Sequence, residues 1–115
     1  MENKSAVYRI DTYYSSSSRR YKENIVDFEH DSSLVYQLSP KNFTYKPYAA
    51  SPTMIDGTGK KHFGYIAEEV NEILPEIVNK DPDGEPEGVK YEMVTVLLVE
   101  EIKKLKARIE VLEGN

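Results

Sequence analysis

Residues 95–112 read TVLLVEEIKKLKARIEVL, and this stretch decides the fold of the chain. Its apolar side chains recur at steps of three and four residues, the heptad pattern of helices that pack against one another. We predict a long helix over about residues 93–113 whose apolar stripe associates with copies of itself. With Ile102 at heptad position a, the core positions a and d hold Thr95, Leu98, Ile102, Leu105, Ile109 and Leu112.

The charged residues beside this stripe indicate how the helices are oriented. Glu101 at position g would face Lys106 at position e of a neighbour, and Arg108 would face Glu113 in the same way. Such pairs form in parallel assemblies. Isoleucine at a with leucine at d is typical of dimers. The alternative is a terminal helix that docks on the core of its own chain.

Three further apolar residues widen the stripe where this helix begins. Val94, Leu97 and Val99 are predicted to pack on the chain's own domain. The remainder of the chain predicts short elements, from periodicity, capping residues and turn residues. The expected elements are strands at 5–14, 42–48 and 61–65 with a hairpin-type turn at 56–59, and helices at 33–38 and 66–74. Asp31 and Ser32 are suited to cap the first of these helices. A hairpin is expected to pair 77–78 with 89–91 across the acidic turn 81–88. The fold class is therefore α+β, a small mixed domain with short strands and hairpins.

Composition excludes several classes of protein. A chain of 115 residues with 39% hydrophobic residues supports one small core, so association with other chains would help its stability. The net charge of −5 argues against nucleic-acid binding. The chain has no cysteine and only two histidines, His30 and His62, so neither disulfides nor a metal site are expected. No apolar run is long enough for a membrane span.

The run Ser15–Ser18, followed by Arg-Arg-Tyr-Lys, holds the candidate chemistry. Ser17 stands five residues before Lys22, and a tight turn could bring the two side chains together. A serine hydroxyl attacks a carbonyl only with the help of a base, and a lysine whose ammonium is desolvated can supply it. Taken alone, a serine run beside basic residues is also typical of a flexible linker.

Four stretches together resemble one family. Residues 17–25 are similar to the Ser-Asp-x-Arg-x-Lys-x-Asn-Ile signature of self-cleaving intramolecular chaperone domains, the peptidase S74 group of phage tail spikes, tail fibres and endosialidases. Residues 38–48 resemble that family's Leu-x-Pro-x-x-Phe-x-Tyr strand. Residues 64–75 resemble its Gly-x-Ile-Ala-Gln-Glu-Val…Pro segment, and residues 91–105 resemble its closing helix. One departure is Ser18, which stands where the family usually has aspartate.

The resemblance implies a homotrimer whose C-terminal helices form a three-stranded coiled coil, which overrides the dimer preference of the a/d pattern. The interface would consist of Leu98, Ile102, Leu105, Ile109 and Leu112. Residues 1–16 would end an upstream passenger of the same polypeptide, and residues 17–115 would form the chaperone. The module would register three phage tail chains for folding in the host bacterial cytoplasm, without a cofactor, a nucleic acid or a membrane as partner, and then release itself.

Release would occur at the Ser16–Ser17 junction by a single self-cleavage. The Ser17 hydroxyl attacks the carbonyl of Ser16, and Lys22 acts as the base. Arg20, which matches the family's arginine, would bind the oxyanion or hold the turn. Asn24 would hydrogen-bond the turn or serve as an ordinary polar residue.

Two other functions are also consistent with the sequence. One is a trimerisation and registration module that does not cleave, with the Ser17 region as a linker, which the departure at Ser18 favours. The other is a coiled-coil adaptor that binds a partner through the acidic helix 66–74.

Overall fold

This computed structural model describes residues 16–46 and 59–114. The chain divides into two compact units, residues 1–30 and 31–115, which are described separately. The strand expected at 5–14 lies outside the described residues, as does most of the turn expected at 56–59. The described part of the first unit holds one element, the 3-10 helix η1, Arg19–Tyr21.

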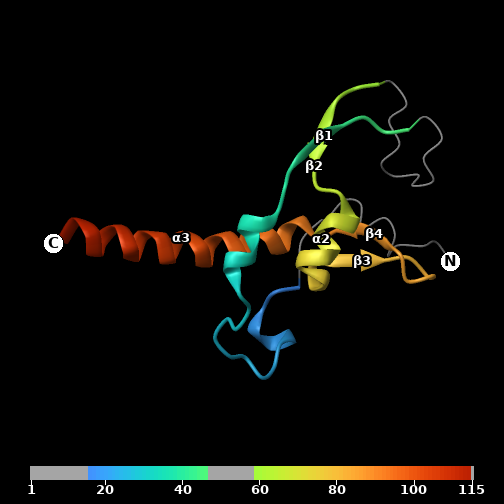
Figure 1. Cartoon of the computed structure of the whole chain (residues 1–115). Helices are drawn as coiled ribbons and strands as arrows, with labels where there is room; N and C mark the ends of the chain where they lie inside the picture. The colour runs from blue at the N-terminus through green and yellow to red at the C-terminus, as the bar shows by residue number, and fades with distance from the viewer. Residues whose placement is uncertain (1–15, 47–58, 115) are drawn as a thin grey trace. The chain divides into compact units, whose positions relative to one another are not determined.

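The second unit is a small mixed α/β domain with short antiparallel strands and a long C-terminal helix (Figure 1). The order of its elements agrees with the order predicted from the sequence. They are the 3-10 helix η2 (Ser32–Gln37), strands β1 (Lys41–Phe43) and β2 (His62–Gly64), helix α2 (Ala67–Ile73), the 3-10 helix η3 (Pro75–Ile77), strands β3 (Val78–Lys80) and β4 (Pro86–Val89), and helix α3 (Tyr91–Gly114).

Both strand pairs are antiparallel. In the first pair Phe43 lies opposite His62, and in the second Val78 lies opposite Val89. The acidic segment between β3 and β4 is a turn, as predicted. The Asp81 carboxylate closes it by accepting hydrogen bonds from the backbone amides of Asp83 (2.9 Å) and Glu85 (3.0 Å). The carboxylate thus satisfies amides that would otherwise lack partners in the turn.

Two boundaries differ from the prediction. The strand expected over 42–48 ends at Phe43, and Tyr45 instead packs its ring edge-on against Phe43 at 5.3 Å between centroids. Tyr91, expected in the last strand, is the first residue of α3. The aromatic side chain suits a strand by propensity, but here the pairing stops at Val89 and Tyr91 stacks on Tyr65 from the helix start.

The core of the second unit forms where α2, η3 and β3 meet the first half of α3. α2 turns its apolar side inward and its glutamates outward, as the periodicity predicts. Leu34, Val35 and Leu38 from the η2 region pack against this core. Its buried members are Val70, Leu74, Ile77, Val78, Val94 and Leu97.

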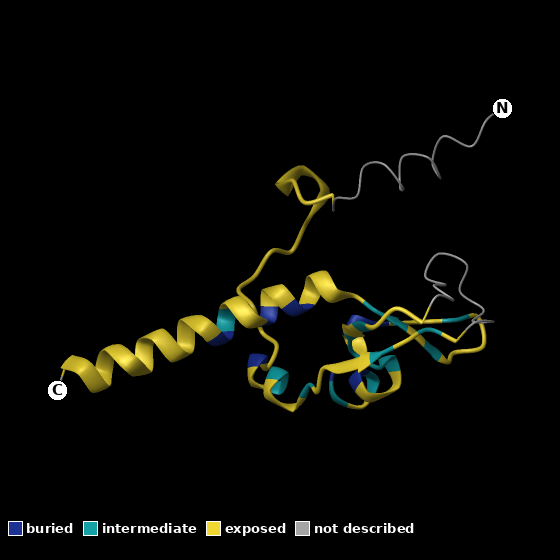
Figure 2. Cartoon of the chain, turned by 90° about the horizontal axis from the view of Figure 1, so that it is seen from above, coloured by how far each residue is buried: buried dark blue, intermediate teal, exposed yellow. Residues whose placement is uncertain are grey.

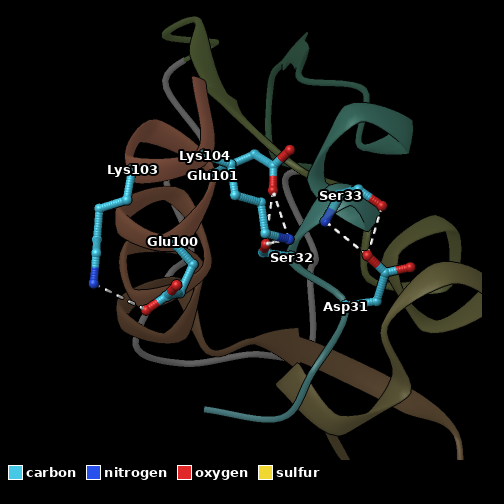
Figure 3. Close-up of polar contacts among 7 residues, drawn as sticks. All are labelled: Asp31, Ser32, Ser33, Glu100, Glu101, Lys103 and Lys104. Carbon is cyan, nitrogen blue, oxygen red and sulfur yellow. Dashed lines mark hydrogen bonds and ion pairs between the residues drawn. The ribbon is translucent and has the colours of Figure 1, made fainter. Parts of the chain in front are cut away.

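A buried polar network joins η2 to α3 (Figure 3). The Ser32 hydroxyl is fully buried and donates a hydrogen bond to Glu101 Oε2 at 2.7 Å. Lys104 Nζ donates to the Ser32 oxygen at 2.7 Å and lies 3.5 Å from the same carboxylate. Asp31 caps η2 by accepting from the Ser33 amide at 3.0 Å, as predicted. The network fixes one particular side of α3 toward the domain.

The structure corrects two predictions made for α3. Glu101 is only 8% exposed and serves its own chain, so the expected pair between Glu101 and Lys106 of a neighbour is wrong. Lys106 instead lies 3.4 Å from Glu110, one turn along the same helix. Val99 was expected to pack on its own domain, but it is 55% exposed, because it points away from the side that Val94 and Leu97 bury.

The Glu101 carboxylate predicts how stability depends on pH. The Ser32 hydrogen bond lowers the pKa of Glu101; burial acts in the opposite direction, and Lys104 and Tyr36 lower the pKa further. A carboxyl group whose pKa is lowered by folding stabilises the fold at pH values above its ordinary pKa of 4.5. This stabilisation is lost as the pH falls through the pKa of the folded state. Glu101→Gln should therefore lower the melting temperature at pH 7, and the difference from the parent should shrink below pH 4.5.

The matched control is Glu110→Gln, which alters an exposed ion pair of the same helix and should change little. Ser32→Ala should destabilise the fold by roughly 1.5–3 kcal/mol, the usual loss for a hydrogen bond to a charged group. Thermal unfolding followed by circular dichroism at one chain concentration measures all three variants. Equal melting temperatures for Glu101→Gln and Glu110→Gln at pH 7 would contradict the role given to the network.

Candidate functional site: the Ser17–Lys22 turn

The serine and the lysine singled out by their spacing lie together in the first unit. η1 makes the turn: the Tyr21 amide donates to the Ser18 carbonyl at 3.0 Å, and the Lys22 amide donates to the Arg19 carbonyl at 3.1 Å. Because this turn reverses the chain, Lys22 Nζ reaches Ser17 Oγ and donates to it at 3.0 Å. This is the distance at which proton transfer between a nucleophile and its base is possible.

Ser18 begins the turn as its N-cap. Its side-chain oxygen accepts from the Arg20 backbone amide at 3.4 Å, and its backbone is extended. Serine and aspartate are both preferred at N-caps because both offer a side-chain oxygen to an unpaired amide. The departure from the family pattern at Ser18 therefore retains a capping oxygen.

The Arg20 side chain stabilises the turn through contacts with two neighbouring residues, Ser18 and Tyr21. Its guanidinium donates to Ser18 Oγ at 3.4 Å and to the Tyr21 hydroxyl at 3.1 Å. The guanidinium carbon also lies 4.7 Å from the centre of the Tyr21 ring, a cation–π distance. Of the two roles expected for Arg20, these contacts favour holding the turn over binding an oxyanion.

Asn24 ends the turn with its backbone. Its φ is +54°, in the left-handed region that residues other than glycine rarely adopt. Asparagine tolerates this region better than most residues, since its short amide can bond locally. The positive φ therefore explains why asparagine suits position 24, and neither of the two roles expected for Asn24 included this backbone conformation.

The site is open to solvent in the single chain. Every residue from 16 to 30 is exposed, including the Ser16–Ser17 junction and Lys22. The geometry supplies a nucleophile and a base in contact, but no surface among residues 16–30, the described part of this unit, excludes water from them. Within the described ranges, no three His, Asp or Glu side chains gather as a metal site would require. No described helix is long and apolar enough to cross a membrane.

The residues predicted for the interface lie along α3 from Leu98 to Leu112, and the part of the helix from residue 102 onward is exposed throughout (Figure 2). They form one apolar stripe along the helix, part of which lines a shallow hollow. Their exposed fractions are 42% for Leu98, 61% for Ile102, 43% for Leu105, 51% for Ile109 and 77% for Leu112. A stripe of large apolar side chains left this open is typical of an association surface.

One contact in the second unit was missed by sequence reasoning. The Tyr91 hydroxyl accepts from the Tyr65 amide at 2.9 Å, which ties the start of α3 to the segment before α2. A Cβ at Gly64 would lie 2.6 Å from that hydroxyl oxygen, so any other residue at this position would displace the Tyr91 hydroxyl. The contact spans 26 residues, and no local pattern in the sequence signals it.

Comparison with known proteins identifies the family. The model of the peptidase S74 family, described as the chaperone of endosialidase, matches residues 17–79, which is more than half of the chain. The chain belongs to the endosialidase-chaperone family. The match begins at Ser17, and it covers the Ser17–Lys22 turn and all of α2.

A phage protein shows the same likeness. The chain is 35% identical over 72 residues to the long tail fibre protein Gp37 of Escherichia phage AR1. The aligned region spans 63% of this chain and 6% of the phage protein. The aligned region is thus a small part of that much longer fibre protein.

The cap at Ser18 can be tested directly. Ser18→Ala removes the capping oxygen, which costs about 1 kcal/mol at a helix N-cap and should lower the population of the closed turn several-fold. Ser18→Asp keeps an acceptor and should leave the turn closed. The measurement is the NMR cross-relaxation between the Ser17 β-protons and the Lys22 ε-protons. An equally strong signal in Ser18→Ala would show that the cap does not position the pair.

Proposed function

We propose that this chain is an intramolecular chaperone of a phage tail protein, which assembles as a trimer and then cuts itself free at Ser17. One observation carries the proposal: a member of the endosialidase-chaperone family leaves the a/d stripe of α3 uncovered in the single chain. The likeness to a tail fibre protein supports the phage tail as the passenger. Residues 1–16 belong to that passenger, and residues 17–115 are the chaperone.

The a/d stripe of α3 supports the trimer. Leu98, Ile102 and Leu105 face one side of the helix, and three parallel copies bury that side around a common axis. Elongated tail proteins are rich in contacts between distant residues, which form slowly and expose surfaces that aggregate. Tethering three C-termini raises the effective concentration of the upstream chains and sets their register.

The contact between Ser17 and Lys22 supports the cleavage. Ser17 Oγ attacks the Ser16 carbonyl carbon while Lys22 Nζ takes the hydroxyl proton. The bond between the Ser16 carbonyl and the Ser17 nitrogen breaks, and the lysine returns a proton to the leaving amine. An ester then joins Ser16 to Ser17 Oγ, and water hydrolyses it to a free carboxylate and the restored hydroxyl. No cofactor is required.

The exposure of the pair supports a delay before cleavage. Lysine works as a base when its charged form is disfavoured, and burial is the usual cause. In the single chain Lys22 is exposed, so the covering surface is supplied by the assembled protein. Cleavage then follows assembly, and loss of the tether makes the assembly effectively irreversible.

The test is the intact mass of the polypeptide with its natural upstream segment, beside Ser17→Ala and Lys22→Ala. We expect a fragment that starts at Ser17 in the parent and full-length chains in both variants, because each variant lacks one member of the pair. The folded trimeric passenger should form in all three, since the chaperone role does not need the cut.

Other outcomes separate the alternatives. A fragment that persists in Lys22→Ala would assign the base to another residue. Full-length chains in all three samples with normal passenger yield would leave a trimerisation module that does not cleave. A passenger that folds equally well without residues 17–115 would contradict the chaperone function and favour an adaptor that binds through α2.

A further inference from the structure

α3 carries a second exposed apolar surface apart from the a/d stripe. Val96 is 52% exposed and Val99 is 55% exposed. At 100° per residue they lie on the side of the helix roughly opposite Val94, Leu97 and Glu101, which are buried in the chain's own domain. The stripe that faces the trimer axis lies between these two sides. Val96 and Val99 therefore have no role in either the core or the a/d stripe.

We propose that this surface, Val96 and Val99, receives η2 of a neighbouring copy of the chain. The inference rests on the proposed parallel trimer. In such a trimer the e position of each helix lies beside the g position of the next helix. Val99 occupies e, whereas Val94 and Glu101 occupy g. The side of α3 that holds its own domain therefore lies next to Val99 of the neighbour.

η2 is the part of the domain that meets the neighbour. It is bound to α3 at the g side, because the buried Ser32 hydroxyl donates a hydrogen bond to the Glu101 carboxylate. Tyr36 is nevertheless 63% exposed, so its ring offers apolar surface beside the polar anchor. A ring with one polar contact and an open apolar face is typical of an interface residue. The Tyr36 ring covers Val99 of the next copy, with Val96 at the rim.

Charge agrees with this arrangement. A neighbour's Lys106 would ordinarily seek an acidic residue at g, but Glu101 is committed to Ser32 and Lys104 of its own chain. Lys106 has an acidic partner on its own helix in Glu110, at 3.4 Å. Specificity between copies near this level thus comes from η2 and the valines rather than from a Glu101–Lys106 bridge.

The consequence is a ring of head-to-tail contacts. Each domain is held between its own α3 and the α3 of the next copy, and three such contacts close on themselves. A misaligned helix would move Val99 away from the neighbour's η2. The contact therefore enforces register, which the short a/d stripe alone would fix weakly.

The chain has no cysteine, so a pair of introduced cysteines reports the contact without background. The variant Tyr36→Cys with Val99→Cys is treated with a flexible bis-maleimide and run under denaturing conditions. We expect covalent dimers and trimers at about tenfold or more above controls, because neighbouring residues react at very high effective concentration. The control pair is Tyr36→Cys with Ala107→Cys, since Ala107 is exposed at the outer f position. Each single-cysteine variant is a second control.

A second pair, Gln37→Cys with Val99→Cys, leaves the Tyr36 side chain in place and covers the case in which the first variant fails to fold. Sedimentation of the parent and of each variant is measured beside the cross-linking. Trimers in solution without covalent products from either pair would overturn the inference while leaving the proposed function standing. A monomeric parent would overturn the proposed trimer, and the inference with it.

Discussion

The fixed rotation of α3 about its own axis is the constraint on which the rest of the structure depends. Val94 and Leu97 bury one side of the helix in the core, and the Ser32–Glu101–Lys104 network holds that side in place. Turning the helix by one residue would leave a carboxylate and a hydroxyl buried without partners, which is costly. The polar network therefore determines which apolar residues remain outside, and these residues are the ones available to other copies.

The candidate chemistry follows a different logic, because it is local. Ser17 and Lys22 meet through a turn of a few residues that Ser18 caps and Arg20 braces. The hydrogen bonds that form this turn join residues 17–22 to one another, so the pair is in contact in the single chain. Within residues 16–30, the described part of the first unit, no surface covers Lys22 and excludes water from it. In the proposed account assembly supplies that surface, so one event links the local site to the long helix.

The sequence predicted the local elements of the fold and the Ser17–Lys22 contact, but not the contacts between distant residues. Periodicity gave α2 and α3, Asp31 was recognised as a cap, and the acidic turn after Lys80 was recognised by its residues. The Ser17–Lys22 contact followed from spacing, because both residues belong to one turn. Glu101 was misread because a glutamate at g looks the same whether it faces a neighbour or a buried serine 69 residues away. The Tyr91 hydroxyl and the glycine that accommodates it likewise belong to a contact between distant segments.

The central claim is that assembly through α3 precedes and permits cleavage at Ser17. The most direct measurement follows oligomeric state and cleavage rate together in Leu105→Asp, with Ala107→Asp as the matched control at an exposed outer position. We expect Leu105→Asp to be monomeric and to be cleaved far more slowly than the parent. We expect Ala107→Asp to be trimeric and to be cleaved at the parental rate. A monomeric Leu105→Asp chain that is cleaved as fast as the parent would contradict the account.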